Sequence, residues 1–273
     1  MIDLGRAGRI ALASSYGLPG REVERAYERG VGFFFWGALR RRDFGGALRR
    51  IARRGRVAIA IQTYARRASL VRPSVDLARL RLGVDAIDVL GLGFWKEPPP
   101  RAILEAAIAL REKGIVGSVV VSSHERSTLA TLIETGSLDG IMARYNAAHP
   151  GAEREVFPLA LAHRRPVLAY TATRWGTLVG PMAATDCYRF VLAHPAVTTC
   201  LAAPKDAREL DDVLAVLDAP PLSAPELAAM RAIGARARAA RPPPLGLVDH
   251  ARAIVRELRA RGITEELVSH FLR

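Results

Sequence analysis

The stretch EPPPRAILEAAIALREKGIVGSVVVSSHE, residues 97–125, has the pattern of one helix followed by one buried strand. Its prolines suit the first turn of a helix, where no backbone N–H donor is needed, and Gly114 suits the helix end. Residues 119–122 then form a short β-branched, apolar run, as buried strands do. The stretch therefore predicts one helix–strand unit of an α/β fold.

The same alternation extends from residue 21 to residue 218. A helix over 21–29 stops at Gly30, and further amphipathic helices are expected around 44–54 and 75–82. Strands that are apolar throughout and separated by helices indicate a parallel sheet covered by helices. The sequence predicts eight such strands, at 10–13, 33–36, 57–62, 86–92, 119–122, 140–145, 167–170 and 197–201.

Eight such units closing on themselves predict a (β/α)8 TIM barrel over about 8–220. A doubly wound open sheet is the alternative, disfavoured because no G-x-G-x-x-G turn follows the first strand. Additional C-terminal helices are expected over about 223–273, one starting at Ser223 and one carrying an apolar face at Ala251, Ile254, Val255 and Leu258. The whole chain, 1–273, is expected to form a single barrel domain.

The composition argues against several classes of partner. The formal charge is +13, but nearly all of it is dispersed arginine with no accompanying binding motif, so a nucleic-acid partner is not expected. Cys187 and Cys200 suit neither a disulfide framework nor a metal site, and no metal is expected. No apolar run approaches a membrane span and no signal pattern is present, so we expect a cytoplasmic protein with a small-molecule ligand.

Five segments resemble the landmarks of the aldo-keto reductase superfamily, in order and at the right spacing. They are AYERGVGFFFWGAL (26–39), LRLGVDAIDVLGLGFW (80–95), EKGIVGSVVVSSHE (112–125), ARYNAAHPGAEREVFPLA (143–160) and AYTATRWGTLVG (169–180). The resemblance implies a barrel that holds a nicotinamide dinucleotide across its C-terminal mouth and reduces carbonyls.

The resemblance also implies a catalytic tetrad of Asp, Tyr, Lys and His, which this chain has lost. Placed by motif, the four positions hold Phe35, Arg40, Gln62 and Gly93. Losing Asp and Lys together avoids an unpaired buried charge, which typically costs about 3–5 kcal/mol. Arg40 could stabilise an oxyanion, but it cannot supply a proton. The candidate catalytic residues are therefore Arg40, Gln62 and His124, the last being a titratable group directly after a strand, while Phe35 is expected to line the pocket.

The cofactor, NADP or NAD, is expected at positions that the resemblance assigns. Tyr170 matches the residue on which the nicotinamide stacks, Ser122 a carboxamide-binding serine, and Gly176 a glycine near the pyrophosphate. Glu209 replaces a phosphate-binding arginine and would repel a 2′-phosphate. Buried packing is an equal alternative for Tyr170 and Ser122. The expected cofactor-binding residues are Ser122, Ser123, Tyr170, Thr171, Gly176, Lys205 and Arg208.

The remaining side chains expected at the mouth suggest a substrate pocket. Its expected lining is Trp36, Tyr64, Trp95, Arg144, Asn146 and Trp175, the tryptophans having barrel-top packing as an alternative role. Arg40, Arg144 and Arg174 together would suit an anionic ligand. Three functions follow: an atypical NAD(P)-dependent carbonyl oxidoreductase, a non-redox enzyme acting on an anionic small molecule, or a catalytically silent ligand-binding or regulatory barrel.

Overall fold

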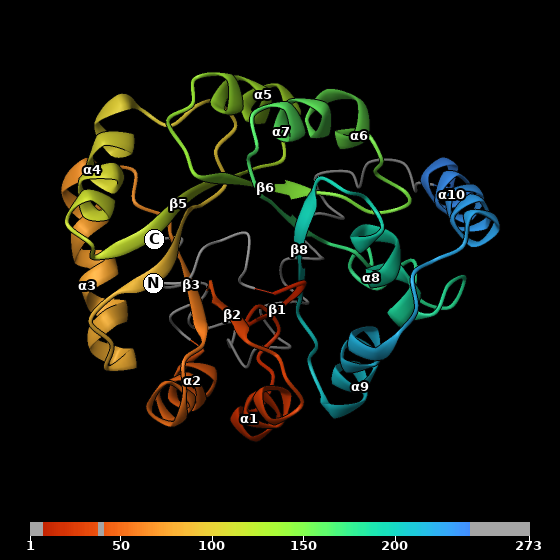
Figure 1. The fold of residues 1–273 in the computed structure, drawn as a ribbon, viewed down its shortest axis with the longest axis horizontal. Helices are drawn as coiled ribbons and strands as arrows, with labels where there is room; N and C mark the ends of the chain where they lie inside the picture. The colour runs from red at the N-terminus through yellow and green to blue at the C-terminus, as the bar shows by residue number, and fades with distance from the viewer. Residues whose placement is uncertain (1–7, 38–40, 241–273) are drawn as a thin grey trace, which may run out of the picture. The chain divides into compact units, whose positions relative to one another are not determined.

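The computed structural model describes residues 8–37 and 41–240. Eight parallel strands form a closed barrel with helices around its outside (Figure 1). Each strand pairs with the next, and β8 returns to β1, where Ile10 lies opposite Cys200. The predicted (β/α)8 barrel is confirmed, and the closed sheet excludes the doubly wound alternative. The strands are β1 (Ile10–Ala13), β2 (Phe33–Trp36), β3 (Ala58–Thr63), β4 (Ile87–Leu92), β5 (Val116–Ser123), β6 (Gly140–Arg144), β7 (Val167–Tyr170) and β8 (Val197–Ala202).

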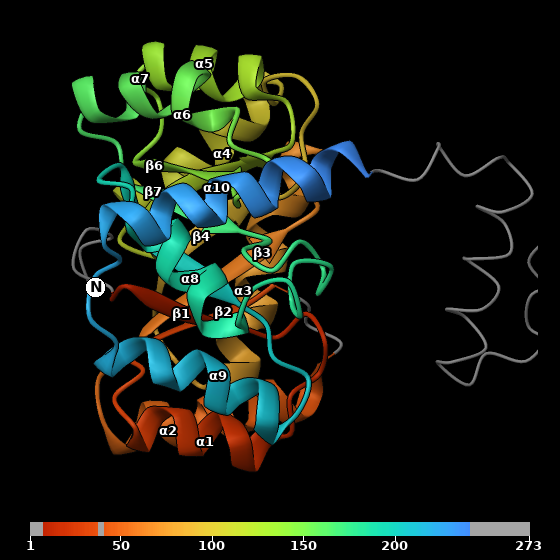
Figure 2. The same ribbon diagram turned by 90° about the vertical axis from the view of Figure 1, so that its right-hand side faces the viewer.

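Helices follow the strands along the chain, and α10 lies against the outer side of the barrel (Figure 2). The prolines before α4 precede the helix instead of forming its first turn: Pro98 and Pro99 each precede another proline, which keeps them out of the helical region, and Pro100 is the N-cap, with an extended ψ of 139°. The helices are α1 (Gly20–Glu28), α2 (Arg42–Arg54), α3 (Val71–Leu82) with the 3₁₀ turn η2 (Ala68–Leu70) before it, α4 (Arg101–Glu112), α5 (Arg126–Glu134), α6 (Ala152–Glu155), α7 (Phe157–Ala162), α8 (Ala184–Leu192), α9 (Ala207–Asp218) and α10 (Ala224–Ala239).

The chain divides into two compact units, Met1–Ala237 and Arg238–Arg273. The first unit holds the barrel, and the helix expected around 251–258 lies outside the described residues. Among the described helices, none combines the length and the apolarity needed to cross a membrane.

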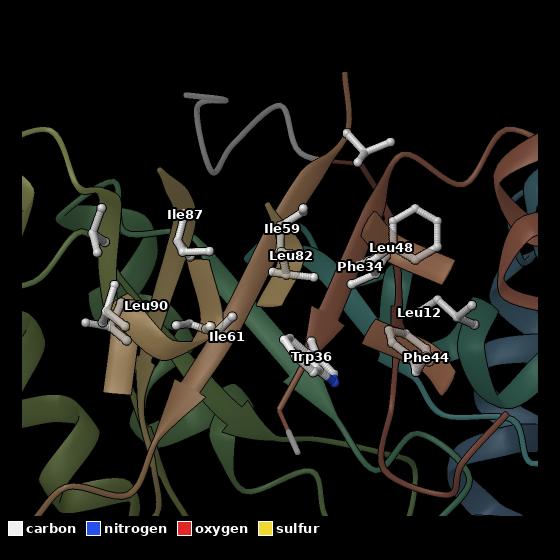
Figure 3. Close-up of a cluster of buried hydrophobic side chains, with 14 of the residues drawn as sticks. Leu12, Phe34, Trp36, Phe44, Leu48, Ile59, Ile61, Leu82, Ile87 and Leu90 are labelled. Atoms are coloured by element: carbon white, nitrogen blue, oxygen red, sulfur yellow. The ribbon is translucent and has the colours of Figure 1, made fainter. Parts of the chain in front are cut away.

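Side chains of each strand alternate between the barrel interior and the layer beneath the helices. On β2, Phe33 and Phe35 point into the interior, while Phe34 and Trp36 pack outward with Phe44 of α2 (Figure 3). The large interior rings are accommodated by small neighbours, since Phe35 lies opposite Ala13 on β1 and Ala60 on β3. Phe35 thereby fills the upper part of the interior, directly below the C-terminal mouth.

Candidate functional site

The C-terminal ends of the strands surround a cavity of about 390 Å³, which we call the mouth pocket. This is the end of the barrel at which ligands bind in this architecture. Its buried apolar lining includes Ala13, Phe35, Met142, Ala172 and Leu201. Its sides and rim include Tyr16, Gln62, Tyr64, Phe94, Ser122, His124, Tyr170, Thr171, Thr173, Trp175 and Tyr188.

Two buried polar atoms in the mouth pocket lack hydrogen-bond partners. Gln62, at the end of β3, is 7% exposed, and its Nε2 has no hydrogen-bond partner. Ser122, on β5, is 1% exposed, and its Oγ also has no partner. A buried donor without a partner costs about 1–3 kcal/mol. Both atoms belong to residues that line one cavity, but the atoms themselves are covered, so a ligand would reach them only after a small shift of the side chains.

Two glycines make room for the side chains that replace the expected tetrad. A Cβ at Gly93 would collide with Nε2 of Gln62, and a Cβ at Gly37 would come within 3.0 Å of Cδ1 of Phe35. The amide of Gln62 therefore occupies space that a side chain at position 93 would need. Arg40 lies outside the described residues, and the identity of these positions with a lost tetrad stays a prediction.

Tyr170, at the end of β7, contributes its half-buried ring to the pocket. Its hydroxyl donates a hydrogen bond to the backbone oxygen of Ser123 at 2.9 Å. Burial raises the pKa of Tyr170, an effect that the nearby Ser122 side chain and the charge of Arg144 only partly offset. Ser122 Oγ therefore lies near this hydroxyl without meeting hydrogen-bond geometry. Tyr170 stays protonated at neutral pH and offers the pocket an aromatic face.

His124 follows β5 and lies on the exposed rim of the mouth pocket. Its ring is 5.5 Å from that of Phe94, edge to face, and 5.7 Å from that of Tyr170. Partial burial lowers the pKa of His124, and the positive charge of Arg144 lowers it further. The imidazole is therefore neutral at pH 7 and available to accept a proton.

The expected anion site is not formed by the described arginines. Arg174 donates a hydrogen bond to the backbone oxygen of Ala237 on α10, at 2.6 Å, and does not line the pocket. Arg144 is also absent from the lining, although its charge reaches His124 and Tyr170. The prediction that Arg144 and Arg174 line the pocket is therefore wrong.

Asn146 was expected in the substrate pocket but is fully buried in the turn after β6. Its Nδ2 donates to the oxygen of Thr171 at 2.8 Å, and its Oδ1 accepts from the backbone N–H groups of Ala148 and His149. Thr171 lines the pocket with a left-handed φ of 65°, which this contact helps to hold. Asn146 therefore supports the position of Thr171 instead of contacting a ligand, and the prediction that it lines the pocket is wrong.

Three further expected contacts are also absent from the lining. Trp36 faces away from the pocket because it follows the inward Phe35, and its Nε1 donates to the oxygen of Arg41 at 3.1 Å. Trp95 packs beneath the guanidinium of Arg66, at 4.2 Å. The Oγ of Ser123 donates to the oxygen of Trp95 at 2.5 Å, so Ser123 stabilises a loop.

The region expected to bind an adenosine phosphate is already neutralised by an ion pair. Nζ of Lys205 lies 2.7 Å from Oε1 of Glu209, and Asp206 caps α9 by accepting from the N–H of Glu209. Arg208 is exposed. Gly176 adopts a left-handed φ of 85° directly after Trp175. This arrangement places the negative charge of Glu209 beside Lys205.

The structure adds lining residues that the sequence did not single out. Tyr16 and Phe94 lie within three residues of the ends of β1 and β4, a position that could have identified them. Tyr188 comes from α8, and no strand-end signal marks it. Tyr64 and Trp175 lie at the rim as expected, while their roles stay predictions.

Comparisons with known proteins agree with this fold. No protein-family profile matches the chain. One curated relative, the NADH-specific methylglyoxal reductase of Escherichia coli strain K12, is 27% identical over 115 residues, 40% of this chain. The match spans about a third, 35%, of that relative's length.

Solved structures match over most of the barrel. An aldo-keto reductase from Bacillus halodurans, in its holo form, has a TM-score of 0.72 at 18% identity, over 82% of this chain and 91% of that one. The glycerol dehydrogenase of Gluconobacter oxydans has a TM-score of 0.73 at 18% identity, over 88% and 95%. A putative 2,5-diketo-D-gluconic acid reductase B has a TM-score of 0.71 at 17% identity, over 84% of this chain and 88% of that one. The resemblance to the aldo-keto reductase superfamily is thereby confirmed at the level of the fold.

Proposed function

We propose that this chain, which has the aldo-keto reductase fold, is an atypical oxidoreductase. It binds a nicotinamide dinucleotide across the mouth pocket and acts on the carbonyl or hydroxyl group of a small molecule. The observation that carries the proposal is the pair of unpartnered buried atoms, Gln62 Nε2 and Ser122 Oγ, in a pocket that also contains the ring of Tyr170. The relative named as NADH-specific supports the same class of cofactor.

The residues present fit the nicotinamide end of such a cofactor. Tyr170 offers a face for ring stacking, and Ser122 Oγ offers a hydrogen bond to a carboxamide. They favour the absence of a 2′-phosphate, because the carboxylate of Glu209 lies beside Lys205 and would repel that group. We therefore propose NAD rather than NADP as the cofactor, with Thr171 and Gly176 in the loop beside it.

We assign the remaining chemistry to two side chains of the lining, Gln62 and His124. When bound, the nicotinamide would supply or accept a hydride at the carbon of the substrate. Gln62 Nε2 would donate a hydrogen bond to the substrate oxygen, polarising it without holding a charge. His124, which is neutral at pH 7, would take the proton from an alcohol as it is oxidised, and would return it in the reverse direction.

Calorimetric titration with NADH and NADPH tests the cofactor assignment. We expect NADH to bind more tightly than NADPH, and Tyr170→Ala to weaken NADH binding by roughly tenfold through lost stacking. Tyr27→Ala is the matched control, because Tyr27 stacks with Arg54 on the helical layer, outside the mouth pocket. Failure of both cofactors to bind, or an unchanged affinity in Tyr170→Ala, would contradict the proposal.

Ligand binding without turnover is the second candidate function. It is favoured by the absence of Asp, Glu and Lys from the described lining of the pocket, which leaves His124 without a carboxylate partner there. Oxidation of NADH in the presence of carbonyl compounds separates the two functions. A non-redox enzyme for anions has less support, since Arg174 is turned toward α10 and Arg144 lies outside the described lining.

A further inference from the structure

We propose that the substrate of the mouth pocket is an uncharged, planar, bicyclic aromatic compound with one oxygen directed at Gln62. This inference names the substrate class of the site proposed above. Only the reaction depends on the proposed function, because binding of the compound is measured without a cofactor. Three features of the described lining carry it: its lack of charge, its exposed aromatic rings and its buried donor.

The lack of charge in the lining is unusual for this chain. The sequence has 40 Lys and Arg and 27 Asp and Glu, yet no such side chain lines the described part of the pocket. An ionised ligand would give up its hydration there without a charged side chain in direct contact, since Arg144 acts on the pocket only from outside its lining. The pocket therefore favours neutral molecules.

The exposed aromatic side chains gather at this one cavity. Tyr16, Tyr64, Phe94 and Trp175 are 52%, 53%, 48% and 56% exposed, and all four line the pocket. In the described ranges, no Phe, Tyr or Trp elsewhere is exposed to this degree. Solvent-exposed apolar surface concentrated in this way marks a binding site.

The rings on one side of the rim form a continuous series. Ring centroids are 6.0 Å apart between Tyr64 and Phe94, 5.5 Å between Phe94 and His124, and 5.7 Å between His124 and Tyr170. Phe94 adopts a left-handed φ of 46°, and Trp175, elsewhere on the rim, one of 54°. Non-glycine residues in this region are strained, and such strain concentrates where a structure presents side chains to a ligand. A planar ligand would stack against such rings.

Size and polarity further define the ligand. A cavity of about 390 Å³ is near the lower end of the usual range for ligand pockets, so it suits a compact ligand, and the aromatic rim favours one with rings. Its deep surface of Phe35, Met142 and Leu201 is apolar. Ser122 Oγ is assigned above to the carboxamide of the cofactor, so the unpartnered polar atom left for the substrate is Gln62 Nε2, which suits one carbonyl or hydroxyl oxygen.

Calorimetry of the full chain with 2-naphthaldehyde, 2-naphthoate, naphthalene and octanal tests this inference. We expect 2-naphthaldehyde to bind at least roughly tenfold more tightly than 2-naphthoate, which carries the same rings and a charge. Gln62→Leu should weaken 2-naphthaldehyde binding about five- to tenfold and leave naphthalene unaffected. Phe94→Ala should weaken every ring compound. Leu80→Ala, at a 76% exposed position on α3, is the control and should change none of them.

The outcomes separate this inference from the proposed function. Binding of 2-naphthoate or octanal as tight as that of 2-naphthaldehyde would overturn the inference, as would no binding of 2-naphthaldehyde. An unchanged affinity in both Gln62→Leu and Phe94→Ala, with folding verified by circular dichroism, would also overturn it. Binding of 2-naphthaldehyde with no oxidation of NADH would instead overturn only the oxidoreductase proposal.

Discussion

Replacing Gly93 with alanine should destabilise the protein through the side chain of Gln62. The new methyl group would collide with Nε2 of Gln62 and lie 3.0 Å from its Cδ and 2.9 Å from Cε1 of Tyr64. Gln62 is 7% exposed, so its amide has little room to move except into the mouth pocket. The substitution therefore requires a shift of the same side chain that we propose to bind the substrate oxygen.

The expected cost lies at the lower end of that for overpacking, about 1–2 kcal/mol, because the atoms that collide are at the end of a flexible side chain. For a chain of this length, it corresponds to a fall in Tm of about 2–8 °C. Gly32→Ala is the matched control in thermal denaturation, since a Cβ there meets nothing within 4 Å. Gly93→Ala should also weaken binding of 2-naphthaldehyde.

A double-mutant cycle tests whether Gln62 is the cause. If the collision dominates, Gly93→Ala should cost at least about 0.5 kcal/mol less in a Gln62→Ala background, where the amide is missing. Equal stability of Gly93→Ala and Gly32→Ala would refute the reasoning. So would a cost that is the same with and without the Gln62 side chain.

Two further predictions concern residues around the pocket. Asn146→Ala should lower the free energy of unfolding by about 1–3 kcal/mol in urea denaturation, because it leaves the N–H group of Ala148 without its partner. The N–H of His149 and the oxygen of Thr171 each lose one hydrogen bond but keep their backbone bonds to the oxygen of Asn146 and the N–H of Arg174. A loss below about 0.5 kcal/mol would count against this role. His124 has a pKa lowered from its usual 6.5, so the unfolded chain takes up the proton first, and Tm should fall as pH falls below about 6.5 until the folded pKa is passed. His124→Gln should make Tm depend less steeply on pH in this range. His194, whose pKa is also lowered by burial, should account for the remaining dependence. The same dependence of Tm on pH in wild type and variant would show that His124 does not have a lowered pKa.

The strands could be predicted closely because each is a short apolar run. The predicted strands 10–13, 33–36 and 167–170 coincide with β1, β2 and β7. Strand β5 begins earlier than predicted, at Val116, because Gly117 and Ser118 obscure the apolar pattern that its backbone pairing continues.

The predicted residues that line the pocket lie at strand ends or in the loops just after them. Gln62 and Tyr170 line the pocket because they point inward at the ends of β3 and β7. Trp36 could not be placed in this way, since four consecutive apolar residues do not reveal which two face inward. Asn146 and Arg174 lie in loops, where no periodicity indicates the direction of a side chain. Their roles depend on contacts with Thr171 and α10 that only the folded chain brings together.

The pairing of β1 with β8 bears on how the chain is made in the cell. Ile10 and Cys200, which lie opposite each other, are about 190 positions apart. At the usual pace of translation, the first strand would leave the ribosome roughly 10–40 s before its final neighbour is synthesised. During that interval Leu12 and Phe34 have no finished sheet around them, so the nascent chain should be a substrate for chaperones until its last strand emerges.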